Sequence, residues 1–237
     1  MINSHFRSSL FTRTLPALAA TGVLAFGVSA CGSDDSDESS SASSTTATST
    51  QSAAVKPAAE VKDVTGGTTG VTLDAGFVEA LTSLKVTPGP VGDAKISDAG
   101  VATFPITGGN VTYYTPGSIS PYVQGELRHD GSGLSLTAGG KKVELTDFVI
   151  DPGASVLTGK VSVDGEVAAE SAPLFFLDGR TLEPLRLTSN DTKAVLEGTT
   201  VKLKQEAADL LNSTFGIDAL KAGLVIGVAK ITVPTGA

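Results

Sequence analysis

His129 is the side chain in this sequence best suited to acid–base or metal chemistry, since the chain holds only two histidines and the other lies in the first ten residues. It ends a strand-like stretch that begins at Val123. Counting by twos places His129 on the same inward face as Val123 and Leu127, just before the turn-like dipeptide Asp130-Gly131. A histidine in this place can ligate a metal ion, or it can hydrogen-bond the backbone groups of the turn. Both roles stay open at this point.

Patterns for other kinds of catalysis are missing from the sequence. Ser132 follows His129 and Asp130 closely, but a catalytic triad needs groups that converge in space, not neighbours in one turn. No nucleophile elbow, metalloprotease helix or calcium loop occurs, and no pair of acidic residues is marked out. We therefore predict that the chain is not an enzyme.

Tyr113, Tyr114 and Tyr122 are the only tyrosines, and they flank a connection at 115–121 that contains two prolines. The chain has no tryptophan, so this is the one place where an aromatic binding surface could form. Aromatic side chains also favour plain strand packing. The three tyrosines are therefore candidate ligand contacts.

The elements that would position these residues read mainly as β-strands. Apolar residues alternate with polar ones in short segments, at 123–127, 134–136, 143–145, 157–163, 185–187 and 201–203. Dipeptides that accept positive φ separate them, namely Asp130-Gly131, Gly139-Gly140, Asp164-Gly165, Asp178-Gly179 and Asn190-Asp191. The continuous apolar run 174–177 predicts a strand buried on both faces. The pattern is typical of an antiparallel β-sandwich or a partly open barrel.

Two short helices are expected to interrupt the strands. Asp74 can cap the first, whose apolar face carries Phe77 and Leu81. The second runs from about Gln205 to Phe215 and ends at Gly216, the residue type preferred after a helix. We expect both to close the ends of the β structure.

Residues 1–30 have the features of an export signal, with Arg7 and Arg13 ahead of an apolar run. The sequence at 28–32 resembles the bacterial lipobox, in which small residues precede an invariant cysteine, here Cys31. Cys31 is the only cysteine, so no disulfide can form within the chain. The resemblance implies lipid on Cys31 that anchors the protein to the outer face of the bacterial cell membrane through acyl chains.

Composition divides the remainder into a tether and a domain. Residues 31–66 are rich in Ser, Thr, Ala and Asp and are expected to be disordered, whereas 67–237 is long enough for one β-rich domain. Removal of the signal would leave 15 basic against 25 acidic residues. This balance argues against nucleic acid as a partner.

The stretch from Gly125 to Leu136 has the pattern G-x-L-x-H-x-G-x-G-L-x-L, which continues at 143–151. With 173–178 and the run 203–223, it resembles the HtaA-type domain of actinobacterial surface haem-uptake proteins. The resemblance spans most of the domain, from about Leu73 to the end.

This resemblance implies a β-sandwich-like fold in which a tyrosine of the first helix ligates haem iron and the histidine of the H-x-G turn supports it. His129 matches that histidine, but the first helix here carries Phe77 and the first tyrosine of the chain is Tyr113. The candidate ligand contacts are therefore His129, Phe77 and the three tyrosines, with His129 as the candidate metal ligand.

We predict a lipid-anchored, non-enzymatic envelope protein with an HtaA-like domain and a surface or ligand-binding role. No cofactor is expected on the residues alone. The alternative function is a haem-binding module that uses His129. The binding partner of the protein is then haem or another component of the cell envelope.

Overall fold

The computed structural model describes residues 55–188 and 190–235, and contacts group Ser52–Ala237 into one compact unit. The strands are β1 (Ala59–Val61), β2 (Thr68–Leu73), β3 (Thr87–Gly92), β4 (Lys95–Ile96), β5 (Val101–Pro105), β6 (Gly108–Tyr113), β7 (Val123–Ala138), β8 (Lys141–Asp151), β9 (Val156–Val163), β10 (Glu166–Asp178), β11 (Arg186–Leu187), β12 (Lys193–Leu203) and β13 (Val225–Pro234). The helices are α1 (Ala75–Ser83), the 3-10 turn η1 (Gly179–Thr181) and α2 (Gln205–Phe215).

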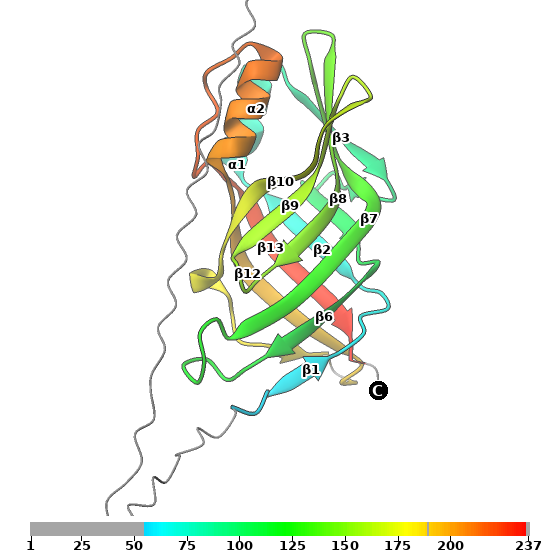
Figure 1. Cartoon of the computed structure of the whole chain (residues 1–237), viewed down its shortest axis with the longest axis vertical. Coiled ribbons are helices and arrows are strands. Elements are labelled where there is room, and N and C mark those ends of the chain that lie inside the picture. Colours follow the sequence, from blue (N-terminus) through cyan, green and yellow to red (C-terminus); the bar gives the residue numbers. More distant parts are fainter. Residues whose placement is uncertain (1–54, 189, 236–237) are drawn as a thin grey trace, which may run out of the picture. The chain divides into compact units, whose positions relative to one another are not determined.

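All strand pairings between these elements are antiparallel, and they form a single sheet that curls into a half-barrel (Figure 1). The order is β1-β6-β7-β8-β9-β10-β12-β13-β2-β5-β4, with β11 added to β12 and β3 to β7. Ile106 and Thr107 join β5 to β6 and donate their amides to the carbonyls of Gly67 and Arg128, at 3.0 and 2.8 Å. The curl therefore brings together strands that lie far apart in the sheet order. The mainly β prediction with two short helices is confirmed, in its partly open barrel form.

β7 is one long strand where a strand, a turn and a second strand were expected. It pairs with β6 through residues 123–128 and with β3 through residues 132–137. Between these halves Asp130-Gly131 forms a bulge, because the partner of His129 is Phe148 while the partner of Gly133 is Thr146. The prediction of a hairpin turn here is wrong.

The bulge is held by a residue of the neighbouring strand. Asp147 of β8 adopts a positive φ of 52°, and its Oδ1 accepts a hydrogen bond from the Gly131 amide at 2.8 Å. Gly131 itself has φ 72°, which a residue with a side chain adopts only at a cost. A β-bulge and a hairpin turn both favour residues that accept positive φ, so Asp130-Gly131 is compatible with either structure.

Two other predicted turns are hairpins as expected. Gly139-Gly140 links β7 to β8 and Asp164-Gly165 links β9 to β10, with all four residues at positive φ. Asp178-Gly179 instead begins η1, where Asp178 caps the short helix. The expected strand at 185–187 is reduced to the two exposed residues of β11.

Both helices match their predictions and lie at the same end of the curled sheet (Figure 1). The Asp74 carboxylate accepts hydrogen bonds from the amides of Gly76 and Phe77 at the start of α1. α2 ends at Gly216, which is left-handed with φ 67°. Its buried residues are Ala207, Ala208 and Leu211.

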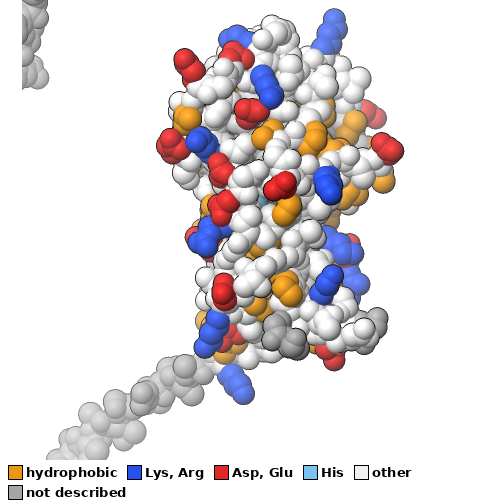
Figure 2. Space-filling view, turned by 90° about the vertical axis from the view of Figure 1, so that its right-hand side faces the viewer, with side chains coloured by type: hydrophobic (Ala, Val, Ile, Leu, Met, Phe, Trp, Pro, Cys, Tyr) orange, Lys and Arg blue, Asp and Glu red, His pale blue; other side chains and the backbone are white. Residues whose placement is uncertain are grey.

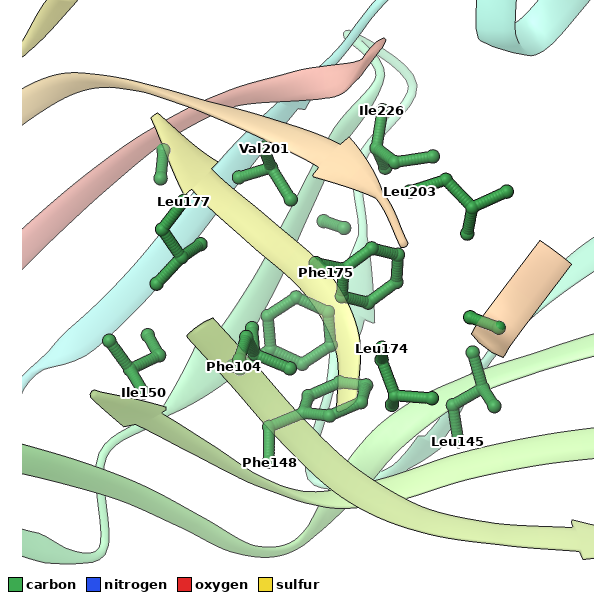
Figure 3. Packing of buried hydrophobic residues seen from close by; sticks show 14 of the residues in the cluster. Phe104, Leu145, Phe148, Ile150, Leu174, Phe175, Leu177, Val201, Leu203 and Ile226 are labelled. Carbon is green, nitrogen blue, oxygen red and sulfur yellow. The ribbon is translucent and has the colours of Figure 1, made fainter. Parts of the chain in front are cut away.

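The core lies inside the curl, where the rings of Phe104, Phe148 and Phe175 point toward one another (Figure 3). Of the apolar run at 174–177, Phe176 is 41% exposed while its neighbours are buried. The prediction that this run is buried on both faces is therefore wrong for Phe176. Strand alternation turns Phe176 away from the core that Phe175 enters.

The fold also includes part of the segment expected as tether. β1 pairs with β6, and Val64, whose amide donates to the Gly109 carbonyl, is fully buried in the core. The predicted signal at 1–30 and Cys31 lie outside the described residues. Neither helix in the described part has the length and hydropathy of a membrane span.

Candidate functional site

His129 lies on the inner face, as predicted, and only 1% of it is exposed. Its Nδ1 is 3.2 Å from the carbonyl oxygen of Phe148, and its Nε2 is 2.8 Å from the hydroxyl of Thr69. The ring also meets Phe104 edge-on, with centroids 6.5 Å apart. His129 thus ties β7 to β8 and, across the curl, to β2.

These partners determine the tautomer of the imidazole. A carbonyl oxygen only accepts, so Nδ1 carries the proton and donates to Phe148, and Nε2 accepts from the Thr69 hydroxyl. Burial lowers the pKa of His129, against smaller opposing effects of the Phe148 carbonyl and of Asp130. The neutral imidazole has both nitrogens in use, and ligation of iron would require one of these bonds to break.

The tyrosines separate into two groups. Tyr113 and Tyr122 pack edge-on with centroids 5.9 Å apart, and the Tyr113 hydroxyl accepts from the amide of Leu185 at 3.4 Å. Tyr114 does not line either of the cavities found inside the curl. Burial, and then the proximity of Tyr113, raises the pKa of Tyr122.

Phe77 lies on α1 and is half-buried against the core. It is not among the residues that line the cavities, and neither is any other residue of α1. The structure therefore does not bring Phe77 together with Tyr122. No group of three or more His, Cys, Asp or Glu side chains gathers as a metal site within residues 55–188 and 190–235.

A cleft of about 330 Å³ opens inside the curl and includes Tyr122 in its wall. Its depth is apolar and is formed by Leu127, Ile150, Leu177 and Ile231, which come from four different strands. A volume of this size with mostly apolar walls is typical of small-molecule sites. The cleft lies at the end of the sheet where β9 stops pairing with β10, after Val156 and Phe176.

We define the mouth of the cleft as Tyr122, Ser155, Gly179 and Arg180; the other polar lining residues are Ser120, Asp178 and Thr199. The Tyr122 hydroxyl is 3.5 Å from the Gly179 carbonyl oxygen, a long contact that leaves it able to meet a ligand. A hydrogen bond links Ser155, which precedes β9, to β10, because the Leu177 amide donates to the Ser155 carbonyl at 2.9 Å.

Asp178 anchors the mouth, with only 5% of its side chain exposed. Arg180 donates to it through Nε and Nη2 at 2.8 and 2.7 Å, and Lys202 donates through Nζ at 2.9 Å. The hydrogen bonds from Arg180 and then Lys202 hold the pKa of the Asp178 carboxyl well below its usual range. Asp178 is therefore ionised and fully partnered at neutral pH.

Sequence reasoning missed Asp178 and Arg180 as site residues. The dipeptide Asp178-Gly179 was assigned to a turn, and the fork from Arg180 back to Asp178 forms only because η1 places them side by side. The partner Lys202 is on β12, which pairs with β10. No local pattern in the sequence marks such a pairing.

A second, smaller void of about 40 Å³ lies behind the cleft, where Ile150, Leu177 and Ala229 line both spaces. His129, Phe104 and Phe148 line its far side. We use the name packed region for five residues around this void: Thr69, Phe104, His129, Phe148 and Phe175.

Comparison with known proteins shows similarity in structure only. No protein-family model matches the chain, and no curated protein sequence matches it. The chain superimposes on the C-terminal domain of HtaA from Corynebacterium glutamicum with a TM-score of 0.51 and 14% identity, over 73% of this chain and 99% of that domain. The N-terminal domain of HtaA aligns with a TM-score of 0.45 at 12% identity, covering 73% and 99% of the two chains.

The haem-binding protein HtaB of the same organism aligns with a TM-score of 0.41 at 11% identity, over 74% of this chain and 95% of that one. The match to the HtaA C-terminal domain shows the fold, and identities this low carry no information on the ligand. The domain therefore has an HtaA-like fold, as the motif at 125–136 predicted.

Proposed function

We propose that this chain, whose domain has the HtaA-like fold, is a lipid-anchored protein of the bacterial cell envelope that binds an apolar small molecule and catalyses no reaction. The observation that carries the proposal is the cleft of about 330 Å³ with its apolar depth and polar mouth. Most of its lining residues belong to strands of the sheet, which suits a preformed binding site.

The chemistry of the lining residues supports binding rather than catalysis. Asp178, the carboxylate of the cleft, is already bonded to two cations and has a low pKa, so it is a poor general base. The imidazole of His129 is buried behind the cleft with both nitrogens bonded. The remaining lining is mostly aliphatic.

Binding can be tested with decanol on the purified domain, Ser52–Ala237, by isothermal titration calorimetry. Ala229→Leu adds bulk where the cleft meets the small void, and Ala138→Leu makes the same change outside the cleft. We expect about a tenfold weaker affinity for Ala229→Leu, equivalent to about 1.4 kcal/mol, and unchanged affinity for Ala138→Leu. Equal binding by both variants would place the ligand elsewhere.

The anchor is proposed from the lipobox-like sequence that ends at Cys31. Cells fed radioactive palmitate should label the wild-type chain and leave Cys31→Ser unlabelled. Equal labelling of the two proteins would contradict the anchor without affecting the binding proposal.

Haem is a second candidate ligand, favoured by the Tyr122 phenol in the wall of the cleft. A tyrosine oxygen is an established axial ligand of haem iron. In this chain Tyr122 would hold the iron in place of the helix tyrosine of the resembling family, since Phe77 has no ligating atom. His129 offers no free nitrogen in the described structure.

Absorption spectroscopy separates these possibilities. Haem should shift its Soret band on mixing with the wild-type domain and with Tyr114→Phe, but not with Tyr122→Phe. Absence of any shift removes haem as the ligand. A shift that survives Tyr122→Phe and is lost in His129→Ala would return iron ligation to His129.

A further inference from the structure

We infer that the cleft is selective for an amphipathic acid, a molecule with an unbranched or flat apolar body and one anionic group, and that Arg180 supplies the counter-charge. The inference rests on the proposed binding function and adds the chemical class of the ligand. It follows from how polar and apolar groups are distributed between the mouth and the depth of the cleft.

The depth of the cleft accepts hydrocarbon and offers little to a polar group. The residues that line the void of about 40 Å³ behind it present apolar surface, and Ile150, Leu177 and Ala229 form the boundary between the two spaces. A polar group pushed this far would lose its hydrogen bonds to water without replacement. The apolar body of a ligand must therefore point inward and its polar group outward.

The charges at the mouth do not balance. Asp178 and Arg180 are the charged residues that line the cleft, and Lys202 approaches Asp178 from β12. One carboxylate thus faces two cations, and the cluster of these three side chains carries one net positive charge. The chain as a whole carries a formal charge of −8, so this positive cluster stands against the overall charge of the protein.

Arg180 is placed to use that charge on a ligand. Its side chain is 84% exposed, and its Nε and Nη2 donate hydrogen bonds to the Asp178 carboxylate. Nη1 makes no hydrogen bond to any of the described residues, so part of the guanidinium fork is available to an incoming anion. The Tyr122 hydroxyl, at its long 3.5 Å contact, adds a second donor on the same rim.

Acidic and basic side chains are mixed along the face of the molecule in Figure 2, which shows no broad basic surface. An extended polyanion would find no matching basic surface on this face. A single small anion needs one guanidinium and one hydroxyl, which is what the mouth provides. Charge and volume together therefore select a small acid.

The test compares decanoate with decanol, which share the same alkyl chain and differ in the charged group, by calorimetry on the domain Ser52–Ala237 at low salt. We expect decanoate to bind about tenfold more tightly than decanol, as a partly exposed ion pair with an added hydrogen bond allows. Raising the salt concentration to about 0.5 M should reduce this preference, because salt screens exposed charges.

Arg180→Gln should abolish the preference for decanoate over decanol. In this variant the Asp178 carboxylate keeps two of its hydrogen bonds. One comes from the backbone amide at position 180 and the other from Lys202. Arg186→Gln is the matched control, because Arg186 pairs with Glu197 outside the cleft. Tyr122→Phe should weaken decanoate by about threefold, in keeping with loss of one exposed hydrogen bond.

The outcomes distinguish the inference from the function on which it rests. If neither decanoate nor decanol binds, the proposed function is overturned. Equal binding of both probes overturns the assignment of an acid while the binding function stands. A preference for decanoate that persists in Arg180→Gln overturns the role of Arg180 as the counter-charge. A preference lost equally in Arg186→Gln shows a general charge effect and also overturns the role of Arg180.

Discussion

Around His129 the side chains of the packed region leave a void of only about 40 Å³, whereas near Tyr122 the same sheet opens into a cleft of about 330 Å³. The packed region holds the edge-on pair Phe104 and Phe148, with ring centroids 5.3 Å apart, and a histidine with both nitrogens bonded. The lining of the cleft is mostly aliphatic.

Strand pairing explains part of this difference. β7 and β8 are paired on both sides of the bulge, and the Asp147–Gly131 hydrogen bond holds the bulge in place. At the other end β9 begins only at Val156, so Leu177 and Asp178 of β10 have strand partners in β12 alone, and the Leu177 amide makes the last hydrogen bond on the β9 side, to the Ser155 carbonyl. Loss of a neighbouring strand leaves an opening that no side chain fills. Stability should therefore depend on the packed region and binding on the cleft.

The neighbours Phe175 and Phe176 provide the largest expected contrast. Phe175→Ala removes a ring from the core and should lower the free energy of unfolding by about 4 kcal/mol. Phe176 is 41% exposed in the cleft wall, so Phe176→Ala should cost about 1 kcal/mol or less. Urea denaturation of both variants measures the difference, and similar losses would contradict the division into two regions.

Replacing His129 tests whether it stabilises the packed region. His129→Ala leaves the Thr69 hydroxyl and the Phe148 carbonyl without their partner and opens a cavity, which together should cost about 3 kcal/mol. Thermal unfolding followed by circular dichroism reports the loss. A variant as stable as the wild type would show that His129 is retained for another reason.

The pH dependence of stability gives a smaller effect from the same residue. The pKa of His129 is lowered in the folded state, so the unfolded chain binds the proton more readily. Stability is complete above the usual value of 6.5 and decreases as the pH falls below it, by at most about 1.4 kcal/mol per pH unit. His129 is the only histidine after residue 30, so His129→Gln should remove the slope between about pH 7 and about pH 5.5. An unchanged slope would assign it to other groups.

Asp178 should give the smallest effect, at the mouth of the cleft. Its pKa is held low by Arg180 and Lys202, so the stability it contributes is present above the usual value of 3.8 and is lost as the pH falls below that value. Asp178→Asn should thus be less stable than the wild type near neutral pH, with the two converging in acid. Chemical denaturation of both proteins at each pH measures this, and a constant difference would argue against the ion pairs.

Much of the fold could be predicted because local patterns reflect local geometry. The alternation at 143–145 and 157–163 correctly marked paired strands, and Asp74 and Gly216 correctly marked helix ends. The inward direction of His129 also followed from counting by twos. These features depend on neighbours within a few residues, which the sequence displays directly.

The candidate site was harder to predict because its parts meet only through long-range pairing. Tyr122 was named as a candidate, but its closeness to Gly179 depends on a contact across 57 positions. The bulge at Asp130 was taken for a turn because both accept the same residue types. Whether a strand continues after such residues depends on the partners available on either side, here β6 and β3.

The sequence by itself determined the class of the fold, the ends of both helices, the phase of the main strands and the resemblance to HtaA-type domains, since each resides in short-range patterns of side-chain type. Only the tertiary structure decided that His129 is fully bonded and that Tyr122 and Arg180 share the rim of an apolar cleft. The reason is physical: bonding partners and empty space depend on how distant strands are placed by the curl of the whole sheet.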